Sequence, residues 1–277
     1  MSNIQCHGPV QADGLHVVQE LVASGACGAA RYDSETGSTN SIAMAALQQA
    51  KCDLTRLPML YLADRQTSGR GRMGRTWISD DATLTFSLVV SNAAFYANSH
   101  LLSLAVGVGV ARSIDHSFAP YRASLKWPND IYLGGSKVAG ILVEATQAVS
   151  QARVVGIGIN VSSSPDLSQS PDAPPVTDVA TAVGRPVDRY TLLEPVVRSV
   201  VESVDALSDD AASVVDEFRS RCLLTGNRIR LVIGENLETG LCRGVNEEGE
   251  LQIQSGQITK AYRSGEASFI RKSAEGY

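Results

Sequence analysis

Residues 69–75 read Gly-Arg-Gly-Arg-Met-Gly-Arg, and this short stretch decides between two kinds of fold. Glycines allow a backbone to approach a ligand closely or to adopt a positive φ. Arginine side chains carry permanent charges whose geometry matches carboxylates and phosphates. The alternation of these two residue types predicts a loop that binds an anion, and we call residues 69–75 the arginine loop. A solvent-exposed basic turn is the simpler alternative for the loop taken alone.

The glycines Gly69, Gly71 and Gly74 also match the Gly-x-Gly-x-x-Gly pattern of dinucleotide-binding folds. That pattern requires a strand before it and a helix that begins at its last glycine. The apolar residues 59–63 predict the strand before the loop. However, residues 83–90 are rich in β-branched and apolar residues and predict a second strand after it. The arginine loop should therefore join two strands, which argues against a dinucleotide-binding fold.

The composition is that of an ordinary globular protein, with 44% hydrophobic and 19% charged residues in a chain of 277. A net charge of −5 argues against broad electrostatic binding of nucleic acid. The five cysteines and four histidines are scattered, which predicts neither a disulfide framework nor a zinc site. The start of the chain lacks signal-peptide features, and the longest apolar run, residues 101–111, is too short to span a membrane. We therefore expect a cytoplasmic protein.

The rest of the chain predicts a mixture of helices and strands up to about residue 225. Hydrophobic periodicity and turn signals place these elements along the chain. Residues 162–175 are rich in Ser, Pro and Asp and predict a loop. The predicted helices cover residues 15–23, a segment that begins at 38 or 39, 99–118, 192–204 and a segment from 214, and the further predicted strands cover 31–34, 124–127, 130–133, 137–145 and 152–161.

From Asn227 onward the sequence changes to short strands separated by turn signals. This spacing predicts a small all-β barrel. We therefore expect a catalytic and binding domain over residues 1–225, in which residues 1–30 have no assigned role, and a barrel over residues 226–277. The predicted strands of the barrel cover residues 228–233, 239–245, 250–254 and 258–263.

Several segments carry polar or charged residues that folding alone does not require. Taken together and in this order, they resemble the biotin protein ligases, and the resemblance runs from about Tyr32 to the C-terminal barrel. The segments are 37–40 (Gly-Ser-Thr-Asn), Gln66 with the arginine loop, 126–130 (Lys-Trp-Pro-Asn-Asp), 137–141 (Lys-Val-Ala-Gly-Ile) and 156–160 (Gly-Ile-Gly-Ile-Asn).

The resemblance implies an α+β fold, in which a mixed β-sheet packs against helices as in class II synthetases and biotin–lipoate ligases. It also implies a small SH3-like β-barrel at the C-terminus. The implied reaction uses ATP and Mg²⁺ to convert biotin to biotinyl-5′-AMP. The biotinyl group then passes to a lysine of a biotin carboxyl carrier protein domain, the implied partner.

The same resemblance assigns roles to individual residues. Trp77 and Trp127 are each left open between a pocket wall and the core, and residues 162–175 are expected to close over the adenylate. The metal ligands stay unknown, with Mg²⁺ arriving on ATP and Asp130 as the candidate from the protein. The implied biotin-binding residues are Ser38, Thr39, Asn40, Gln66, Arg70, Gly71, Arg72 and Lys137; those for ATP or the adenylate are Arg70, Arg72, Arg75, Trp77, Lys126, Asn129, Lys137 and Asn160; and those for catalysis are Arg72, Lys137, Lys126 and Asp130.

Two other functions compete with this assignment. Lipoate ligases and octanoyltransferases share the implied fold, but they resemble Arg-Arg-x-x-Gly-Gly-Gly at the loop and lack the Lys-Trp-Pro-Asn-Asp segment. A sensor that keeps biotinyl adenylate without transferring it is the second alternative. Ligases that also act as repressors carry an N-terminal DNA-binding domain, whereas only about 30 non-basic residues precede the resemblance here. We therefore expect no DNA binding and no membrane association, and a homodimer stays open.

Overall fold

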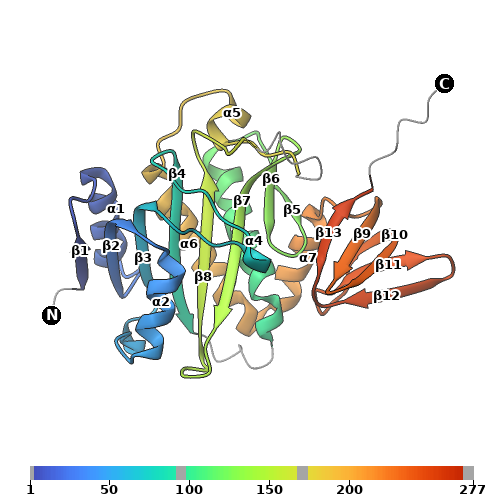
Figure 1. The fold of residues 1–277 in the computed structure, drawn as a ribbon, viewed down its shortest axis with the longest axis horizontal. Coiled ribbons are helices and arrows are strands. Elements are labelled where there is room, and N and C mark those ends of the chain that lie inside the picture. The colour runs from blue at the N-terminus through green and yellow to red at the C-terminus, as the bar shows by residue number, and fades with distance from the viewer. Residues whose placement is uncertain (1–2, 92–97, 167–173, 271–277) are drawn as a thin grey trace.

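The larger sheet contains eight strands, in a computed structural model that describes residues 3–91, 98–166 and 174–270. Strands β1 to β3 are parallel and all other neighbours are antiparallel, which confirms the predicted mixed sheet (Figure 1). Along the sheet the strands are β1 (Ile4–His7), β2 (Ala29–Thr36), β3 (Met59–Gln66), β4 (Thr83–Ser91), β8 (Ala152–Asn160), β7 (Ser136–Ala145), β6 (Asp130–Leu133) and β5 (Ser124–Lys126).

The arginine loop joins two neighbouring antiparallel strands, β3 and β4, as predicted. Its only regular element in the described chain is a short 3-10 turn, η2 (Arg72–Gly74). No α-helix begins at Gly74, so the structure does not form a dinucleotide-binding motif. The expected strand around residues 31–34 is longer in the structure, and β1 was not predicted because its four residues are largely exposed and lack an apolar pattern.

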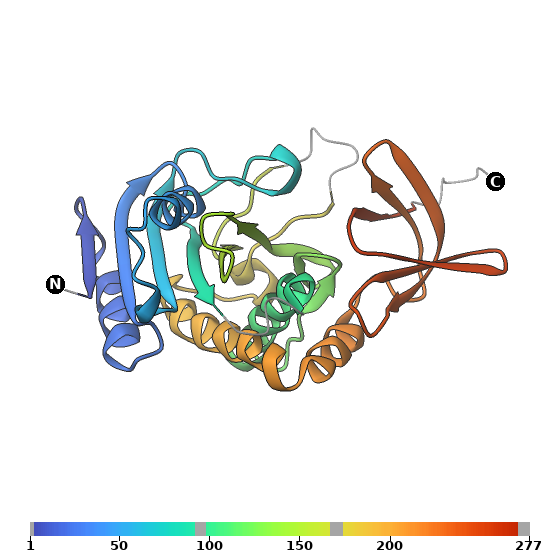
Figure 2. The same cartoon turned by 90° about the horizontal axis from the view of Figure 1, so that it is seen from below.

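The helices cover both faces of this sheet. Figure 2 shows α4, α6 and α7 along one face, while α2 lies on the other face against β3, β4 and β8. The helix α5 was not predicted, and of the expected loop at residues 162–175, residues 167–173 lie outside the described chain. The helices are α1 (Ala12–Ala23), α2 (Thr39–Gln48), α4 (Leu102–Ser117), α5 (Val179–Val183), α6 (Tyr190–Asp209) and α7 (Ala211–Arg221), with 3-10 turns η1 (Leu54–Arg56) and η3 (Ser99–Leu101).

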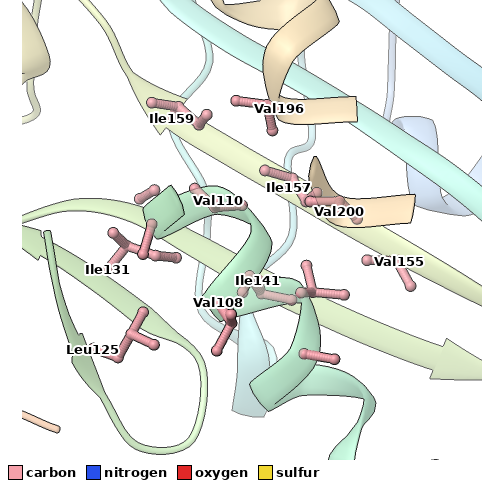
Figure 3. Packing of buried hydrophobic residues seen from close by; sticks show 14 of the residues in the cluster. Val108, Val110, Leu125, Ile131, Ile141, Val155, Ile157, Ile159, Val196 and Val200 are labelled. Carbon is pink, nitrogen blue, oxygen red and sulfur yellow. The ribbon is translucent and has the colours of Figure 1, made fainter. Parts of the chain in front are cut away.

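The main core lies between the sheet and the helices α4 and α6. Val108 of α4 and Val200 of α6 are fully buried, and Figure 3 shows them together with Ile157 of β8. Branched apolar side chains at helical spacing on α4 and α6 produce this contact, since they form one stripe on each helix. The same cluster continues into the C-terminal strands through Leu224 and Ile229.

The C-terminal segment forms a second, fully antiparallel sheet of five strands. Its edge strands do not pair with each other, so the predicted SH3-like barrel is open, although the arrangement is compatible with that fold. Strand β13 was not predicted, and Trp127 lies in the core, where its indole N–H donates to Gly249 O at 3.1 Å. The strands are, in order, β12 (Ile258–Tyr262), β11 (Leu251–Ser255), β10 (Asn236–Val245), β9 (Arg228–Ile233) and β13 (Glu266–Phe269).

Within the described part of the chain, every helix is too short or too polar to cross a membrane. The division of the chain near residue 225 stays a prediction, because the main hydrophobic cluster continues across that point.

The close approach of α4 to α6 predicts a large effect for a very small substitution. A Cβ at Gly109 would lie 2.7 Å from both Ser199 O and Val200 Cα of α6. Gly109→Ala should therefore lower the free energy of unfolding by about 1–3 kcal/mol, because backbone atoms of a packed helix cannot give way easily. Chemical denaturation followed by circular dichroism measures the change.

The matched control is Gly107→Ala, two residues away and on a different face of the same helix. Its Cβ would meet the Leu125 side chain at 3.5 Å, an ordinary contact. Alanine also favours a helix over glycine by up to about 1 kcal/mol. Equal losses of stability in the two variants would contradict the packing described for α4 and α6.

Candidate functional site

A pocket of about 200 Å³ lies where the arginine loop, the start of α2 and strands β6, β7 and β8 meet. Every predicted site residue except Lys126 lines it. The structure therefore brings together residues from five separate segments of the chain. The predicted residues on its wall are Ser38, Thr39, Asn40, Gln66, Arg70, Gly71, Arg72, Arg75, Trp77, Asn129, Asp130, Lys137 and Asn160.

The first residues of α2 form a neutral, polar part of the wall. Of the two predicted helix starts, Ser38 and Thr39, Ser38 occupies the N-cap position, but its side chain forms no capping hydrogen bond. Instead, the Thr39 N–H donates to Gln66 Oε1 at 2.7 Å. The side chain of a distant strand end thus satisfies one of the backbone N–H groups that every helix start leaves unpaired.

A chain of hydrogen bonds connects this neutral wall to the arginine loop. The Ser87 hydroxyl, which is fully buried, shares a hydrogen bond with the Thr39 hydroxyl at 2.7 Å and donates to Asn40 Oδ1 at 2.6 Å. Asn40 Nδ2 in turn donates to Glu144 Oε2 at 2.8 Å. Arg70 pairs with the same carboxylate oxygen, so Glu144 links α2 to the loop.

Two positions of the arginine loop require glycine for different structural reasons. Gly74 adopts a φ of 74° beside Met73, whose φ is 56°, and this left-handed pair turns the chain back. Gly69 has no room for a side chain, because a Cβ would lie 2.3 Å from Trp77 O. The Trp77 N–H donates to Gly69 O at 2.9 Å, which closes the loop on itself.

Two lysines face one carboxylate at the next part of the wall. Lys137 Nζ donates to Asp130 Oδ1 at 2.5 Å. Lys126 lies behind Asp130, 8% exposed, with its ammonium 3.8 Å from Asp130 Oδ2. Burial lowers the pKa of Lys126, and the Asp130 charge opposes that shift. Asp130 therefore lies between a pocket lysine and a buried one.

The remaining arginines of the loop contact the second sheet. Arg72 donates to Asn129 Oδ1 at 3.0 Å and to Gly265 O at 3.5 Å. Arg75 donates to Glu266 Oε1 at 2.6 Å. Burial lowers the pKa of Arg72 because its guanidinium is removed from water, while the charges of Asp130 and Glu266 oppose that shift, and its hydrogen bonds go to neutral oxygens. Arg72 is thus the loop arginine that is best placed to gain from an anionic ligand.

Trp77 forms an apolar wall across the sheet. Its indole packs on the backbone of Gly158 and Gly140, and a Cβ at Gly158 would lie 2.3 Å from the indole Cε2. The indole Nε1 is buried and forms no hydrogen bond within the described chain. Asn160, at the end of β8, donates to Thr177 O at 3.1 Å. Gly158, inside the strand predicted over residues 152–161, therefore marks a close approach of the indole, whereas Gly156 of the same strand lies against Asn40.

Sequence reasoning missed three residues that hold the site together. Glu144 interrupts the apolar run of β7, and that interruption was the available signal, whereas Ser87 is one of several Thr and Ser residues along β4 and no pattern distinguishes it. Glu266 lies in β13, a strand that was not predicted. Their partners are far away in sequence, so no local pattern connects them to the loop.

The described residues contain no cluster of three or more His, Cys, Asp or Glu side chains that could hold a metal ion. Among the described residues that line the pocket, Asp130 is the one carboxylate. Any divalent cation would therefore need oxygen ligands from a bound substrate in addition to Asp130.

Comparisons with known proteins show which family this chain is similar to. The model of the "Biotin/lipoate A/B protein ligase family" matches residues 36–160. A biotin--[acetyl-CoA-carboxylase] ligase of Mycobacterium tuberculosis is 30% identical over 247 residues, which are 86% of this chain and 88% of that protein. The bifunctional ligase/repressor BirA of Bacillus subtilis is 28% identical over 208 residues, or 73% of this chain, and the chain spans 64% of its length.

A solved structure, the biotin protein ligase from Aquifex aeolicus in complex with biotin and ATP, superposes with a TM-score of 0.74. It shares 30% identity, and the match covers 88% of this chain and 99% of that one.

The packing of Trp77 on Gly158 predicts that one added methyl group moves the indole. In a Trp127→Phe background Trp77 is the remaining one of two tryptophans. Gly158→Ala should then shift the fluorescence emission to the red, because the displaced indole becomes more exposed to water. The matched control is Gly37→Ala, where a Cβ would meet no atom within 4 Å. An unchanged emission maximum in Gly158→Ala would contradict the packing.

Proposed function

The chain belongs to the biotin/lipoate A/B protein ligase family, and from this membership we propose that it is a biotin--[acetyl-CoA-carboxylase] ligase. It activates biotin with ATP to give biotinyl-5′-AMP. It then transfers the biotinyl group to a lysine of a biotin carboxyl carrier protein domain.

One observation carries the proposal, namely that a single pocket combines neutral amide and hydroxyl groups with several cations. The ureido ring of biotin offers two N–H donors and one carbonyl acceptor, which suit Thr39, Asn40 and Gln66. The carboxylate at the other end of biotin needs positive charge, which Arg72 and Lys137 supply. Ser38, Arg70 and Gly71 complete the proposed biotin site.

In the first step, a biotin carboxylate oxygen attacks the α-phosphorus of ATP. A new O–P bond forms, the bond to the β-phosphate oxygen breaks, and pyrophosphate leaves. The two reacting groups are both anions and repel each other strongly in a site with little water. Arg70, Arg72 and Lys137 offset that repulsion and the charge that develops. The step needs no general base, because the carboxylate is already ionised at pH 7.

The residues present suit a magnesium ion that arrives with ATP. Mg²⁺ commonly binds one or two carboxylates and substrate phosphates rather than a protein cage, and Asp130 with the amide oxygen of Asn129 is the proposed protein part of that site. When bound, Mg²⁺ would neutralise phosphate charge. Asn129, Trp77, Arg75 and Asn160 complete the proposed ATP site, with Lys126 acting from behind Asp130.

In the second step, the carrier lysine amine attacks the carbonyl carbon of the mixed anhydride. An amide bond forms, the C–O bond to the phosphate breaks, and AMP leaves with that electron pair. The amine loses one proton, and Asp130 is the proposed acceptor because it faces the pocket. Asp130 also accepts a hydrogen bond from Lys137, so the proton would reach a carboxylate that is part of an ion pair rather than an isolated one.

Several finer expectations belong to the same proposal. Pro165 and Pro174 line the pocket on either side of residues 167–173, which lie outside the described chain, and closure of that loop over the adenylate stays a prediction. A cytoplasmic location, a carboxylase carrier domain as partner, the absence of DNA binding and a possible homodimer are likewise predictions.

The choice of acid tests the function directly. Purified protein with Mg-ATP should release pyrophosphate in the presence of biotin and should biotinylate a carrier domain. Lipoate and octanoate should support little turnover, since they lack a ureido group for the neutral wall. Turnover with either of these acids but not with biotin would overturn the proposal. Adenylate formation without transfer to any tested carrier domain would favour a sensor.

Arg72 should control how long the adenylate stays bound. Arg72→Ala removes a charged hydrogen-bonding group, so biotinyl-5′-AMP should dissociate about 10- to 100-fold faster. Rapid dilution with trapping of the released adenylate measures the rate. Met73→Ala is the control in the same loop, because the Met73 side chain is 64% exposed. Equal rates for Arg72→Ala and Met73→Ala would contradict the assigned role.

A further inference from the structure

A buried arginine that does not line the pocket holds both ends of the loop that carries the pocket arginines. The Arg189 side chain is 5% exposed and comes from the residue directly before α6. Its Nη1 donates to Asp64 O at 2.8 Å in β3 and to Thr83 O at 3.0 Å in β4. Asp80 O lies within reach of the same nitrogen at 3.3 Å. One guanidinium thus connects the backbone before and after the loop.

The location of these contacts matters because the two strands separate there. Pairing between β3 and β4 ends at Ala63 and Thr85. Beyond that pair the chain leaves the sheet as residues 67–82, which include the whole arginine loop. Arg189 bridges the strands beyond their last pair, where the ladder no longer holds them together. Buried main-chain carbonyls need hydrogen-bond donors, and a guanidinium can supply several from one plane.

The position of Arg189 is itself fixed by a buried polar cluster. Its Nη2 donates to Asp64 Oδ1 at 3.2 Å and to the Tyr190 hydroxyl at 2.8 Å. The hydroxyls of Tyr32 and Tyr190 both donate to the Asp64 carboxylate. Burial raises the pKa of both tyrosines, so each keeps its proton. The buried carboxylate thus has a charged partner and neutral donors.

The helix α1 covers this cluster and gives the N-terminal segment a structural task. The Gln11 N–H, at the start of α1, donates to Asp64 Oδ2 at 3.3 Å. Gly14 of α1 leaves space for the tyrosines, since a Cβ there would lie 2.3 Å from the Tyr32 hydroxyl and 2.6 Å from the Tyr190 ring. Residues 1–30 had no role assigned from the sequence, and Gln11 and Gly14 of this segment therefore cover the polar cluster around Arg189 from one side.

We propose that Arg189 is a positioning residue that fixes the two ends of the segment 67–82 and thereby aims the arginine loop at the pocket. It touches no pocket wall and acts only through the backbone of β3 and β4. The proposal rests on the proposed function for its kinetic readout, but the mobility of the segment can be measured without any substrate. Lysine cannot replace it fully, because a single ammonium cannot reach the same set of carbonyls.

The test compares Arg189→Ala with Arg221→Ala. Arg221 is a matched control, because its side chain is 8% exposed and also binds a carboxylate, Asp115, and a main-chain carbonyl, Ala123 O. Hydrogen exchange of residues 67–82 should become about 10-fold faster or more in Arg189→Ala. It should stay unchanged in Arg221→Ala at equal loss of thermal stability. Equal exchange of the segment in both variants would overturn the proposal.

Kinetics and rescue provide the second readout. Arg189→Ala should raise the KM for biotin about 10-fold or more, with a smaller change in kcat, because the loop is no longer held ready for the ligand. Ethylguanidinium should restore both the KM and slow exchange in Arg189→Ala but not in Arg221→Ala. Failure of rescue in a folded variant would contradict the positioning role.

The experiment also distinguishes failure of the positioning role from failure of a variant to fold and from failure of the proposed function. If Arg189→Ala does not fold, Arg189→Lys is used, and its segment 67–82 should still exchange faster than that of wild type. If exchange responds as expected while wild-type protein forms no biotinyl adenylate, the positioning role holds and the proposed function fails.

Discussion

The site depends on holding several cations close together before any ligand is present. Positive charges within a few ångströms repel, and removal from water makes that repulsion stronger. The chain offsets it by pairing most of these cations with carboxylates, as with Arg70 and Glu144 or Lys137 and Asp130. Arg72 is the exception among the loop arginines, since its hydrogen bonds go to neutral oxygens. An incoming anion therefore meets one arginine that has no carboxylate partner among the described residues, and neighbouring cations that could exchange a carboxylate for the ligand.

Local sequence signals predicted the elements that carry the site better than the contacts between them. The strands before and after the arginine loop follow from their apolar residues, and the start of α2 follows from its small polar residues. The pairing of Glu144 with Arg70 spans 74 positions in the chain, and that of Arg189 with Asp64 spans 125. No periodicity encodes such pairs, because they exist only once the sheet has assembled. Strand β13 was missed for the same reason, since its four residues become a strand by pairing with β9.

The second sheet is joined to the pocket as well as to the core. Gly265 and Glu266, at the start of β13, contact the arginine loop through Arg72 and Arg75. On the other side, Trp127 donates to Gly249 O between β10 and β11. The second sheet therefore contacts the arginine loop through Gly265 and Glu266 and the core through Gly249. This arrangement gives the C-terminal strands a physical connection to the loop that the sequence pattern alone did not reveal.

The capping of α2 by Gln66 has a consequence for ligand orientation. A backbone N–H can only donate, so the bond from Thr39 commits the oxygen of the Gln66 amide. The Gln66 NH₂ group is then the end that remains for a ligand, and it can only donate. Asn40 is committed in the same way, because its oxygen accepts from Ser87 and its nitrogen donates to Glu144. The direction of one helix backbone thus decides where the neutral wall presents hydrogen-bond donors. A ligand ring bound in the reverse orientation would place its own donors against these donors.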